Sequence, residues 1–512
     1  MLNDIGVIIN SKIIRHPFNG PIPLYTLLQA LDVHLAMPCA GNHACGKCKI
    51  RVTGALSPIS TDEACFLSEA EIQQGVRLAC YAQVLGDIAI EPPQDTVCTL
   101  SSVSLPSGME ALPGYGLAVD VGTTTIAMQL YDRSQEVLVG EALSANQQNS
   151  FGADVISRIE FSNQHGTEAL SDALHRQLEA MAASCLRQAD ISQVDEVVLT
   201  GNTTMLHFWE RLDPRGIAVA PFVPVSLFGC VSAWPLAGAF PYLPPCTGAY
   251  VGGDITCSIL ASGLLERPHE TSLLIDLGTN GEIVLHHGEK LLCASTAIGP
   301  AFEGANLSCG MSASPGAISS LSLSGDGRVS YRVIQNCAPS GICGSGVLDA
   351  VRIMLELGIL DESGLICENL AQTASHLGTP AWKIPRTDIW ITQADIRQIQ
   401  LAKAAVFAGI ETLLATQNLT AEEIGRFYIA GGFGHFMNLS SAARVGLFPQ
   451  TLVRKAVVLG NASLSGAIVL LMHGSGDALA QIQRQATEIP LSGNPVFSES
   501  YIEHMMFERE FK

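Results

Sequence analysis

The stretch GLAVDVGTTTIAMQLYD at residues 116–132 is an apolar run that ends in an acid, turns through a glycine and three threonines, and continues as a second apolar run. The same design returns at residues 273–295 as LLIDLGTNGEIVLHHGEKLLCAS. Each copy predicts two strands joined by a tight turn. A single copy would be weak evidence, but two copies within matched apolar strands indicate an internal duplication.

The turn residues are of the types that bind phosphate. Glycine lets the backbone approach an anion, and successive amides and threonine hydroxyls donate hydrogen bonds to it. Asp120 and Asp276 would repel phosphate directly, so they make sense only with Mg²⁺ and its waters between. Two facing hairpins could therefore grip the phosphates of a nucleotide. The residues predicted to line them are Gly122, Thr123, Thr124, Thr125, Gly278, Thr279, Asn280 and Gly281.

A cysteine-rich loop, AMPCAGNHACGKCKIR, occupies residues 36–51. Its spacing is C-x5-C-x2-C, and a fourth cysteine follows at a distance in RLACYAQ. Three thiolates from one loop and one from afar are typical of a two-iron cluster. A zinc site more often pairs two short knuckles, and a disulfide is disfavoured in a reducing compartment. The cluster reading is favoured, with Cys39, Cys45, Cys48 and Cys80 as ligands.

Basic residues accompany these cysteines, and Lys47, Lys49, Arg51 and Arg77 could form a positive rim that steers an acidic partner. An ordinary solvated face explains them equally well. Of the other thiols, Cys65, Cys98, Cys309 and Cys343 are expected only to pack.

The flanking sequence predicts a small sheet that cradles one helix. Strands are expected at residues 4–10 and 12–18, a helix at 22–33, and further strands after the cysteine loop. Residues 99–115 are rich in Ser, Pro and Gly, which is the composition of a linker. We therefore place a domain at 1–98 and a second one at 116–512.

Composition limits the partners. Apolar residues make up 47 % of the chain, the net charge is −20 and only 28 residues are Lys or Arg, which argues against nucleic acid and against an anionic membrane. The apolar residues 456–476 are too interrupted to span a membrane and are read as a buried helix. Fifteen cysteines, and an N-terminus without a signal-peptide pattern, predict a cytoplasmic protein.

The motifs resemble two known families. The N-terminal segment looks like a β-grasp [2Fe–2S] ferredoxin, and the paired hairpins resemble the ASKHA superfamily of actin, Hsp70 and sugar kinases. That resemblance implies an α/β multidomain fold, in which a ferredoxin domain precedes a two-lobed, duplicated RNase H-like domain. Lobe I would cover about 116–270 and lobe II about 271–512.

Further segments fit the ASKHA pattern. EVVLTGNTTMLHF (196–208) and a helix at about 393–416 look like its two connecting segments. RFYIAGGFGHFMN (426–438) looks like the adenosine motif, and ICGSGVLDAV (342–351) resembles the segment that closes on the nucleotide. The resemblance implies that adenosine is bordered by Gly344, Gly346, Gly431 and Gly432, although a plain turn explains any one of them equally well.

Taken together, a ferredoxin domain ahead of an ASKHA domain resembles the reductive activators of corrinoid proteins. GPAFEGANLSCGMSASPGAI (299–318) and YVGGDITCSIL (250–260) look like that family. Some members carry an extra domain where this chain has only the linker. Related activators place a four-iron cluster at the C-terminus, and residues 368–512 contain no cysteine.

The resemblance implies an ATP-hydrolysing electron-transfer activator that passes one electron from a [2Fe–2S] cluster to Co(II) of a corrinoid protein, regenerating Co(I) for methyl transfer. ATP and Mg²⁺ would be cofactors, and a low-potential donor would reload the cluster. The acidic residues expected to act in nucleotide turnover are Asp120, Asp276, Asp254 and Glu282, with Glu303 as a further candidate for water activation.

Two other functions remain open at this point. One is a metabolite kinase or ATP-dependent amidohydrolase with a redox-sensing ferredoxin domain, and the other is a non-enzymatic redox chaperone. The sequence does not identify the corrinoid protein, the methyl donor or the reductant. It also leaves open whether the chain forms a homodimer.

Overall fold

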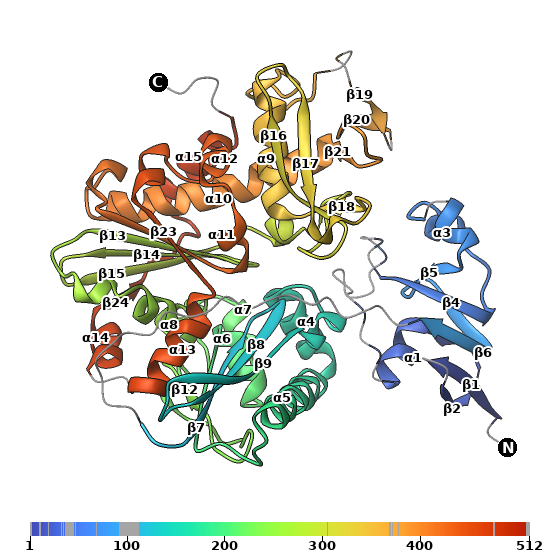
Figure 1. The fold of residues 1–512 in the computed structure, drawn as a ribbon, viewed down its shortest axis with the longest axis horizontal. Coiled ribbons are helices and arrows are strands. Elements are labelled where there is room, and N and C mark those ends of the chain that lie inside the picture. The colour runs from blue at the N-terminus through green and yellow to red at the C-terminus, as the bar shows by residue number, and fades with distance from the viewer. Residues whose placement is uncertain are drawn as a thin grey trace.

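The computed structural model describes residues 3–91 except 10–11, 19, 32, 34, 36–42, 44–45, 47 and 68, and residues 112–507 except 305, 368–369, 371, 377 and 475–476 (Figure 1). Two of the four expected cluster ligands, Cys39 and Cys45, therefore lie outside the described residues. So do Lys47, Cys98 and most of the predicted linker.

The N-terminal domain is a mixed sheet packed on a short helix (blue in Figure 1). Its strands run in the order β2-β1-β6-β4-β5, with β1 parallel to β6 and β3 pairing with β6. The elements are β1 (Asn3–Ile9), β2 (Lys12–Phe18), β3 (Ile22–Pro23), α1 (Leu24–Ala30), β4 (Lys49–Leu56), α2 (Thr61–Ala64), α3 (Glu69–Gln73), β5 (Val76–Leu78) and β6 (Gln83–Glu91).

The core of this domain confirms the predicted strands and helix. Leu24, Leu27 and Leu28 of α1 are buried against Val7 and Ile88 of the sheet, as their helical spacing requires. The helix begins at Leu24, later than predicted, because Ile22 and Pro23 pair with β6.

Lobe I is built on one six-stranded sheet. It comprises β7 (Tyr115–Val121), β8 (Thr125–Asp132), β9 (Val137–Ala145), η1 (Gln147–Ser150), α4 (Val155–His165), α5 (Glu168–Ala189), β10 (Glu196–Gly201), α6 (Thr203–Trp209), α7 (Arg215–Ala218), β11 (Cys230–Val231), β12 (Tyr242–Leu243), α8 (Gly253–Ser262) and η2 (Leu264–Glu266).

Lobe II follows and carries a second six-stranded sheet and two small three-stranded sheets. It comprises β13 (Ser272–Leu277), β14 (Gly281–His287), β15 (Lys290–Thr296), η3 (Pro300–Glu303), β16 (Ala317–Leu323), β17 (Val329–Val333), η4 (Ile334–Asn336), β18 (Gly341–Ile342), α9 (Gly344–Glu356), β19 (Thr373–His376), β20 (Thr379–Lys383), β21 (Trp390–Thr392), α10 (Gln393–Thr416), η5 (Ala421–Glu423), β22 (Arg426–Ala430), α11 (Gly432–Phe436), α12 (Leu439–Val445), η6 (Gln450–Lys455), β23 (Ala456–Gly460), α13 (Ala462–His473), α14 (Ala478–Gln485), β24 (Ala486–Glu488) and α15 (Pro495–Glu503).

The two large sheets share one topology, which confirms the predicted duplication. In lobe I an antiparallel meander β7-β8-β9 is joined by β10 parallel to β7 and by β12 parallel to β10. In lobe II the meander β13-β14-β15 is joined in the same way by β22 and β23. The carboxyl ends of β7 and β10, and of β13 and β22, therefore meet at one edge of each sheet.

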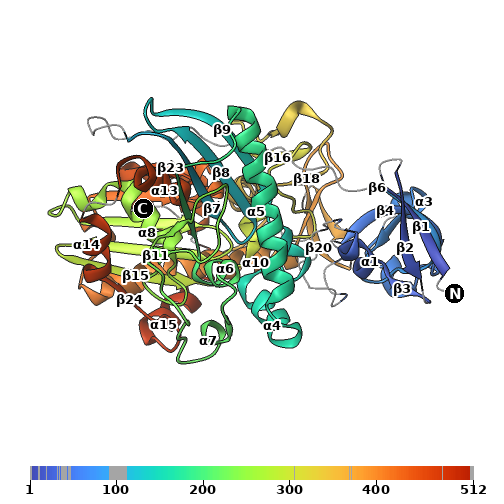
Figure 2. The same cartoon turned by 90° about the horizontal axis from the view of Figure 1, so that it is seen from below.

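Helices cover both faces of the lobe I sheet. Helices α5 and α6 pack on one face through the cluster that includes Leu117, Leu174 and Trp209. The other face is covered by α13, which comes late in the chain and packs through Leu464 and Ile468 (Figure 2). Helix α8 in turn packs on the lobe II sheet, so the sheet of each lobe is covered by a helix that belongs to the other lobe.

The apolar residues 456–476 were expected to form one buried helix, and that expectation is wrong in its first part. Residues 456–460 form strand β23, which pairs with β22, and the helix begins only at Ala462. Short apolar runs do not distinguish a buried strand from a buried helix.

The predicted helix at about 393–416 is confirmed as α10. Its N-terminus is fixed by a capping box between Thr392 and Asp395. Within the described chain it is the one helix long and apolar enough to cross a membrane, but 72 % of that apolar window is buried inside the protein. It is a core helix of lobe II.

Helices α8 and α13 approach each other so closely that only glycine fits at Gly466. A Cβ there would lie 2.0 Å from the carbonyl oxygen of Cys257. We expect Gly466→Ala to lower the free energy of unfolding by about 1–3 kcal/mol, because the two helices would have to separate. Chemical denaturation measures this. Gly325→Ala, where a Cβ meets nothing within 4 Å, is the matched control; equal effects of the two substitutions would contradict the reading.

Candidate functional site

In each large sheet, the first two strands are joined by a tight turn at the predicted position. The amide of Gly122 donates to the carbonyl of Thr125 at 3.0 Å, and the amide of Gly278 donates to the carbonyl of Asn280 at 3.0 Å. A Cβ at Gly122 would lie 2.6 Å from the Thr125 oxygen, so glycine is needed there. The predicted strand–turn–strand units are present at both places.

The two turns meet across the lobes. The hydroxyl oxygens of Thr124 and Thr279 lie 3.0 Å apart. Both hydroxyls also donate to the carboxylate of Glu303, at 2.8 Å from Thr124 and at 3.3 and 3.4 Å from Thr279. The fold thus brings together two threonines that are 155 residues apart in the chain.

The turn of lobe I is held from behind by Arg158, which is fully buried on α4. Its guanidinium donates to the carbonyls of Thr123 at 2.6 Å and Gly152 at 2.9 Å, and to the side chain of Asn149. Burial lowers the pKa of Arg158 to about 9, although the carboxylate of Glu303 acts in the opposite direction. A positive charge is therefore fixed directly behind the turn.

Asp120, Asp254 and Asp276 face one another at the ends of β7, α8 and β13. Loss of water and mutual repulsion raise the pKa of Asp254 to about 8 and that of Asp276 to about 7. The pKa of Asp120 is raised by burial, although Asn461 and Ser463 donate to its two oxygens at 2.8 and 2.9 Å. Such raised values are typical of carboxylates gathered at a functional site.

Glu282 belongs to the same cluster. Loss of water, with repulsion from Asp254 and Asp276, raises its pKa well above the ordinary value, while the hydroxyl of Ser295 donates to it at 3.1 Å. The four acids predicted from sequence are therefore close enough to repel one another. The pKa of Glu303 is also raised by loss of water, and the two threonine hydroxyls oppose the shift.

Among the described residues, no group of three or more histidines, cysteines or acids is placed to hold a metal ion directly. The assignment of Asp120 and Asp276 to Mg²⁺ through its waters stays a prediction.

The four glycines expected to border adenosine fall into two groups. Gly431 follows β22 with φ +93°, and a Cβ there would lie 2.4 Å from the carbonyl oxygen of Leu277. At Gly432 a Cβ would meet nothing within 4 Å. Gly344 and Gly346 are buried at the start of α9, where a Cβ would strike the carbonyls of Phe302 at 1.7 Å and Ile318 at 2.4 Å. Close packing alone thus explains glycine at 344 and 346.

Sequence reasoning missed two asparagines that orient the turns. Asn202 caps α6 and donates from its amide to the hydroxyl of Thr123 at 2.9 Å. Asn461 caps α13 and donates to Asp120. The signal was available, because each asparagine directly follows the glycine that ends an apolar strand, in TGNTT at β10 and in LGNAS at β23.

In the N-terminal domain the structure describes two of the expected cluster ligands. The sulfurs of Cys48 and Cys80 lie 3.3 Å apart, and both residues are buried. This exceeds the about 2.05 Å of a disulfide. The contact between the sulfurs lowers the pKa of Cys48 to about 7, which favours the thiolate that binds metal.

His43, in the middle of the cysteine loop, contacts the turn between β5 and β6 that carries the fourth cysteine. Its Nε2 lies 2.9 Å from the carbonyl of Cys80, and its ring stacks on Tyr81 with centroids 4.3 Å apart. The Tyr81 hydroxyl donates back to the His43 carbonyl at 3.2 Å. These contacts hold His43 against the turn that carries Cys80.

The positive rim considered from sequence is absent for the residues that the structure describes. Arg77 is buried in an ion pair with Glu63 at 2.8 Å. Lys49 pairs with Glu71 at 2.7 Å, and Arg51 pairs with Glu91 at 2.9 Å. Each described cation is thus offset by a carboxylate, which leaves little net field to steer a partner.

Comparison with known proteins places these features in one family. Family models match residues 9–85 (2Fe-2S iron-sulfur cluster binding domain), 115–267 (RACo middle region) and 270–511 (C-terminal domain of RACo, the ASKHA domain). The corrinoid activation enzyme RamQ of Eubacterium limosum is 33 % identical over 432 residues, which cover 79 % of this chain and 72 % of that protein. The chain belongs to the family of reductive activators of corrinoid proteins.

Two further proteins support the assignment of the chain to this family. The [Co(II) methylated amine-specific corrinoid protein] reductase of Methanosarcina barkeri is 25 % identical over 430 residues and covers 76 % of each chain. A solved reductive activator for corrinoid, iron-sulfur protein matches with a TM-score of 0.70 at 28 % identity and covers 98 % of each chain. The predicted fold class, a ferredoxin domain followed by an ASKHA domain, is confirmed.

The facing acids of the activator predict a pH-dependent stability. A carboxyl group whose folded-state pKa exceeds its unfolded value destabilises the fold progressively as pH rises from the unfolded to the folded pKa. For Asp254 that window runs from about 4 to about 8. Without nucleotide and Mg²⁺, we expect Asp254→Asn to be more stable than wild type, by a margin that grows between pH 5 and pH 8 at no more than about 1.4 kcal/mol per unit.

Denaturation midpoints across this pH range measure the margin. The exposed Asp388 provides the control, since Asp388→Asn should show no such trend. A constant difference between Asp254→Asn and wild type would show that Asp254 does not titrate in this window.

A second prediction concerns His43. Removing its contacts with Cys80 and Tyr81 should free the cysteine loop, so His43→Ala should lose iron to a chelator on the order of 10-fold faster, as supporting residues of metal sites do. Tyr81→Phe should have a smaller effect because only its hydroxyl bond is lost. Loss of visible absorbance under a chelator follows the rate, with His16→Ala on β2 as the control; equal rates in all proteins would contradict the assigned role.

Proposed function

We propose that this activator uses ATP turnover to drive one electron from its [2Fe–2S] cluster to Co(II) of a partner corrinoid protein, which regenerates Co(I) for methyl transfer. The observation that supports the nucleotide part is the meeting of Thr124 and Thr279 between two lobes that carry facing acids. The cysteine pair 48 and 80, together with the family, supports the redox part.

In the N-terminal domain, Cys48 and Cys80 would hold the cluster together with Cys39 and Cys45. Bound there, a two-iron cluster supplies a one-electron carrier. The buried apolar residues around Cys48 and Cys80 limit access of water to the sulfurs. His43, which contacts the carbonyl of Cys80, would help to hold this set of ligands together.

In the ASKHA domain, the hydroxyls and amides of the two turns would bind the phosphates of ATP. Asp120 and Asp276 would hold Mg²⁺ through its waters. Loss of water raises the pKa of Asp254 and that of Glu282, which makes either group, once ionised, a stronger base toward an attacking water. The adenosine would lie against Gly431 and Gly432 at the end of β22.

Energy must be supplied because the electron moves uphill. Ferredoxin clusters of the plant type lie near −400 mV, and an illustrative gap of roughly 200 mV to the cobalt couple costs about 4.6 kcal/mol. Changing the preference for one redox state of the partner from 1:99 to 99:1 takes about 5.5 kcal/mol of differential binding. Nucleotide-driven opening and closing of the lobes can supply an amount of this size by binding the Co(II) form and releasing the reduced one.

The test follows Co(II) and Co(I) bands of a corrinoid methyl-transfer protein by anaerobic visible spectroscopy, with reductant and this protein, before and after ATP. We expect Co(I) to accumulate only with ATP. Asp276→Ala should reduce the rate at least about 100-fold, as loss of an essential charged group does. Cys80→Ser should also abolish the response.

Two variants serve as controls for that experiment. Asp326→Asn and Cys65→Ser change exposed residues of the same types and should leave the rate unchanged. ATP-independent reduction, or hydrolysis that responds to a small metabolite and ignores the corrinoid protein, would overturn the proposal.

A further inference from the structure

Glu303 lies where the two lobes meet, at the end of η3. It is partly buried, and its carboxylate accepts hydrogen bonds from Thr124 of lobe I and Thr279 of lobe II. The next residue, Gly304, has φ +81°, and a Cβ there would lie 2.0 Å from the carbonyl oxygen of Met311. The backbone is therefore fixed in the turn that directs the carboxylate between the lobes.

The groups that interact with the Glu303 carboxylate are of the kinds that bind anions. Both hydroxyls belong to the turns assigned above to the phosphates, and the buried guanidinium of Arg158 lies behind the lobe I turn and interacts electrostatically with Glu303. A carboxylate and a phosphate oxygen accept the same hydrogen bonds and carry the same sign of charge. The chain thus supplies its own anion to hydroxyls that a nucleotide would need.

We infer that Glu303 is an internal competitor for the phosphate site, which joins the two turns in the nucleotide-free protein and must leave them when nucleotide binds. The inference rests on the proposed nucleotide binding and adds to it a residue that sets nucleotide affinity. It follows from electrostatics, because a phosphate placed on Thr124 and Thr279 would lie directly against the Glu303 carboxylate.

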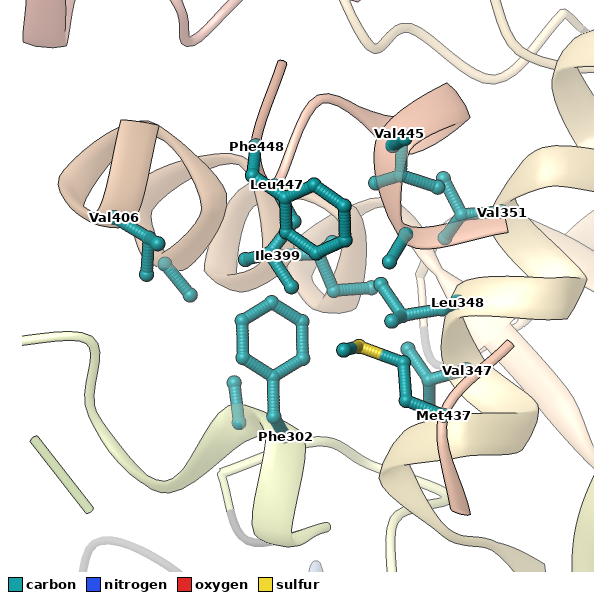
Figure 3. Packing of buried hydrophobic residues seen from close by; sticks show 14 of the residues in the cluster. Phe302, Val347, Leu348, Val351, Ile399, Val406, Met437, Val445, Leu447 and Phe448 are labelled. Atoms are coloured by element: carbon teal, nitrogen blue, oxygen red, sulfur yellow. The ribbon is translucent and has the colours of Figure 1, made fainter. Parts of the chain in front are cut away.

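The surroundings indicate which part moves. The neighbouring Phe302 is buried in the core of lobe II, where Figure 3 shows it facing Ile399, Met437 and Phe448. Its ring also stacks on Phe433 of α11, with centroids 5.2 Å apart. Since this anchor fixes the backbone of η3, the side chain of Glu303 is the part free to leave.

The stacking of Phe302 on Phe433 also connects Glu303 to the part of the site assigned to adenosine. Phe433 lies on α11, directly after the glycines assigned to adenosine. A nucleotide that contacts both regions would thus act on Glu303 from two sides, through phosphate repulsion and through α11. Glu303 would then leave the two turns only when a complete nucleotide is present.

The test measures binding of a non-hydrolysable ATP analogue with Mg²⁺ to the full-length holoprotein by titration calorimetry. We expect Glu303→Gln, which keeps the shape and removes the charge, to bind the analogue at least about tenfold more tightly than wild type. Glu303→Ala should bind at least as tightly. Glu303→Asp, which keeps the charge on a shorter side chain, should fall between wild type and Glu303→Gln.

The matched control is Glu282→Gln, which removes a carboxylate of the same cluster that bonds to Ser295 instead of the turns. A gain in affinity in this variant as large as in Glu303→Gln would mean that any lost charge suffices, and would overturn the specific role. Unchanged or weaker binding by both Glu303→Gln and Glu303→Ala would also overturn it and would favour a direct role of Glu303 on the nucleotide or its attacking water.

Failure of the proposed function has a different signature. If neither wild type nor any Glu303 variant binds the analogue, nucleotide binding itself is wrong and the competitor role falls with it. If wild type binds and the variants bind no more tightly, only the competitor role is wrong. Binding by Glu303→Gln with no detectable binding by wild type would support it most strongly.

Discussion

The molecule is organised around carboxylates of like charge that are held face to face between two lobes. Asp120 is buried, Asp254, Asp276 and Glu282 are partly buried, and neighbouring members of the set repel one another. In the free chain this arrangement costs free energy, because each acid is charged less easily than in solution. On the proposed function, Mg²⁺ bound among these acids would offset that cost, and the repulsion would favour binding of the cation with its nucleotide. The fold of the two lobes keeps these acids from moving apart.

The duplicated topology explains how so many polar groups reach one place. Parallel pairing of β10 with β7, and of β22 with β13, aligns their carboxyl ends at the edges that face each other. Asn202 follows β10 and Asn461 follows β23, and each caps the helix that comes next. One asparagine orients Thr123 and the other orients Asp120. Helix α13, which Asn461 begins, also packs on the sheet that carries Asp120.

The sequence predicts those parts of the site that are local in the chain. The two turns, the cysteine spacing and α10 follow from patterns within about ten to twenty residues, where strand, turn and helix signals are strong. It does not predict Arg158 or the link from Glu303 to both turns, since these contacts join residues that only the tertiary fold brings together. For Arg77 the sequence suggests a surface role that the structure does not support. A basic residue near a ligand suggests a surface charge, but Glu63 pairs with it inside the domain.

The buried Arg158 connects the turn of lobe I to the N-terminal domain. Arg158 binds Thr123 and also Gln148 and Asn149 of η1, while Asn146 bonds to Gly122 and Thr124. The last residue of η1, Ser150, donates to the carbonyl of Leu35, just before the cysteine loop, at 3.5 Å. A nucleotide can bias the ferredoxin domain only to the extent that it binds two arrangements of this segment differently. Because Arg158 makes the turn and η1 one unit, a change at Thr124 cannot leave Ser150 in place unless these bonds break.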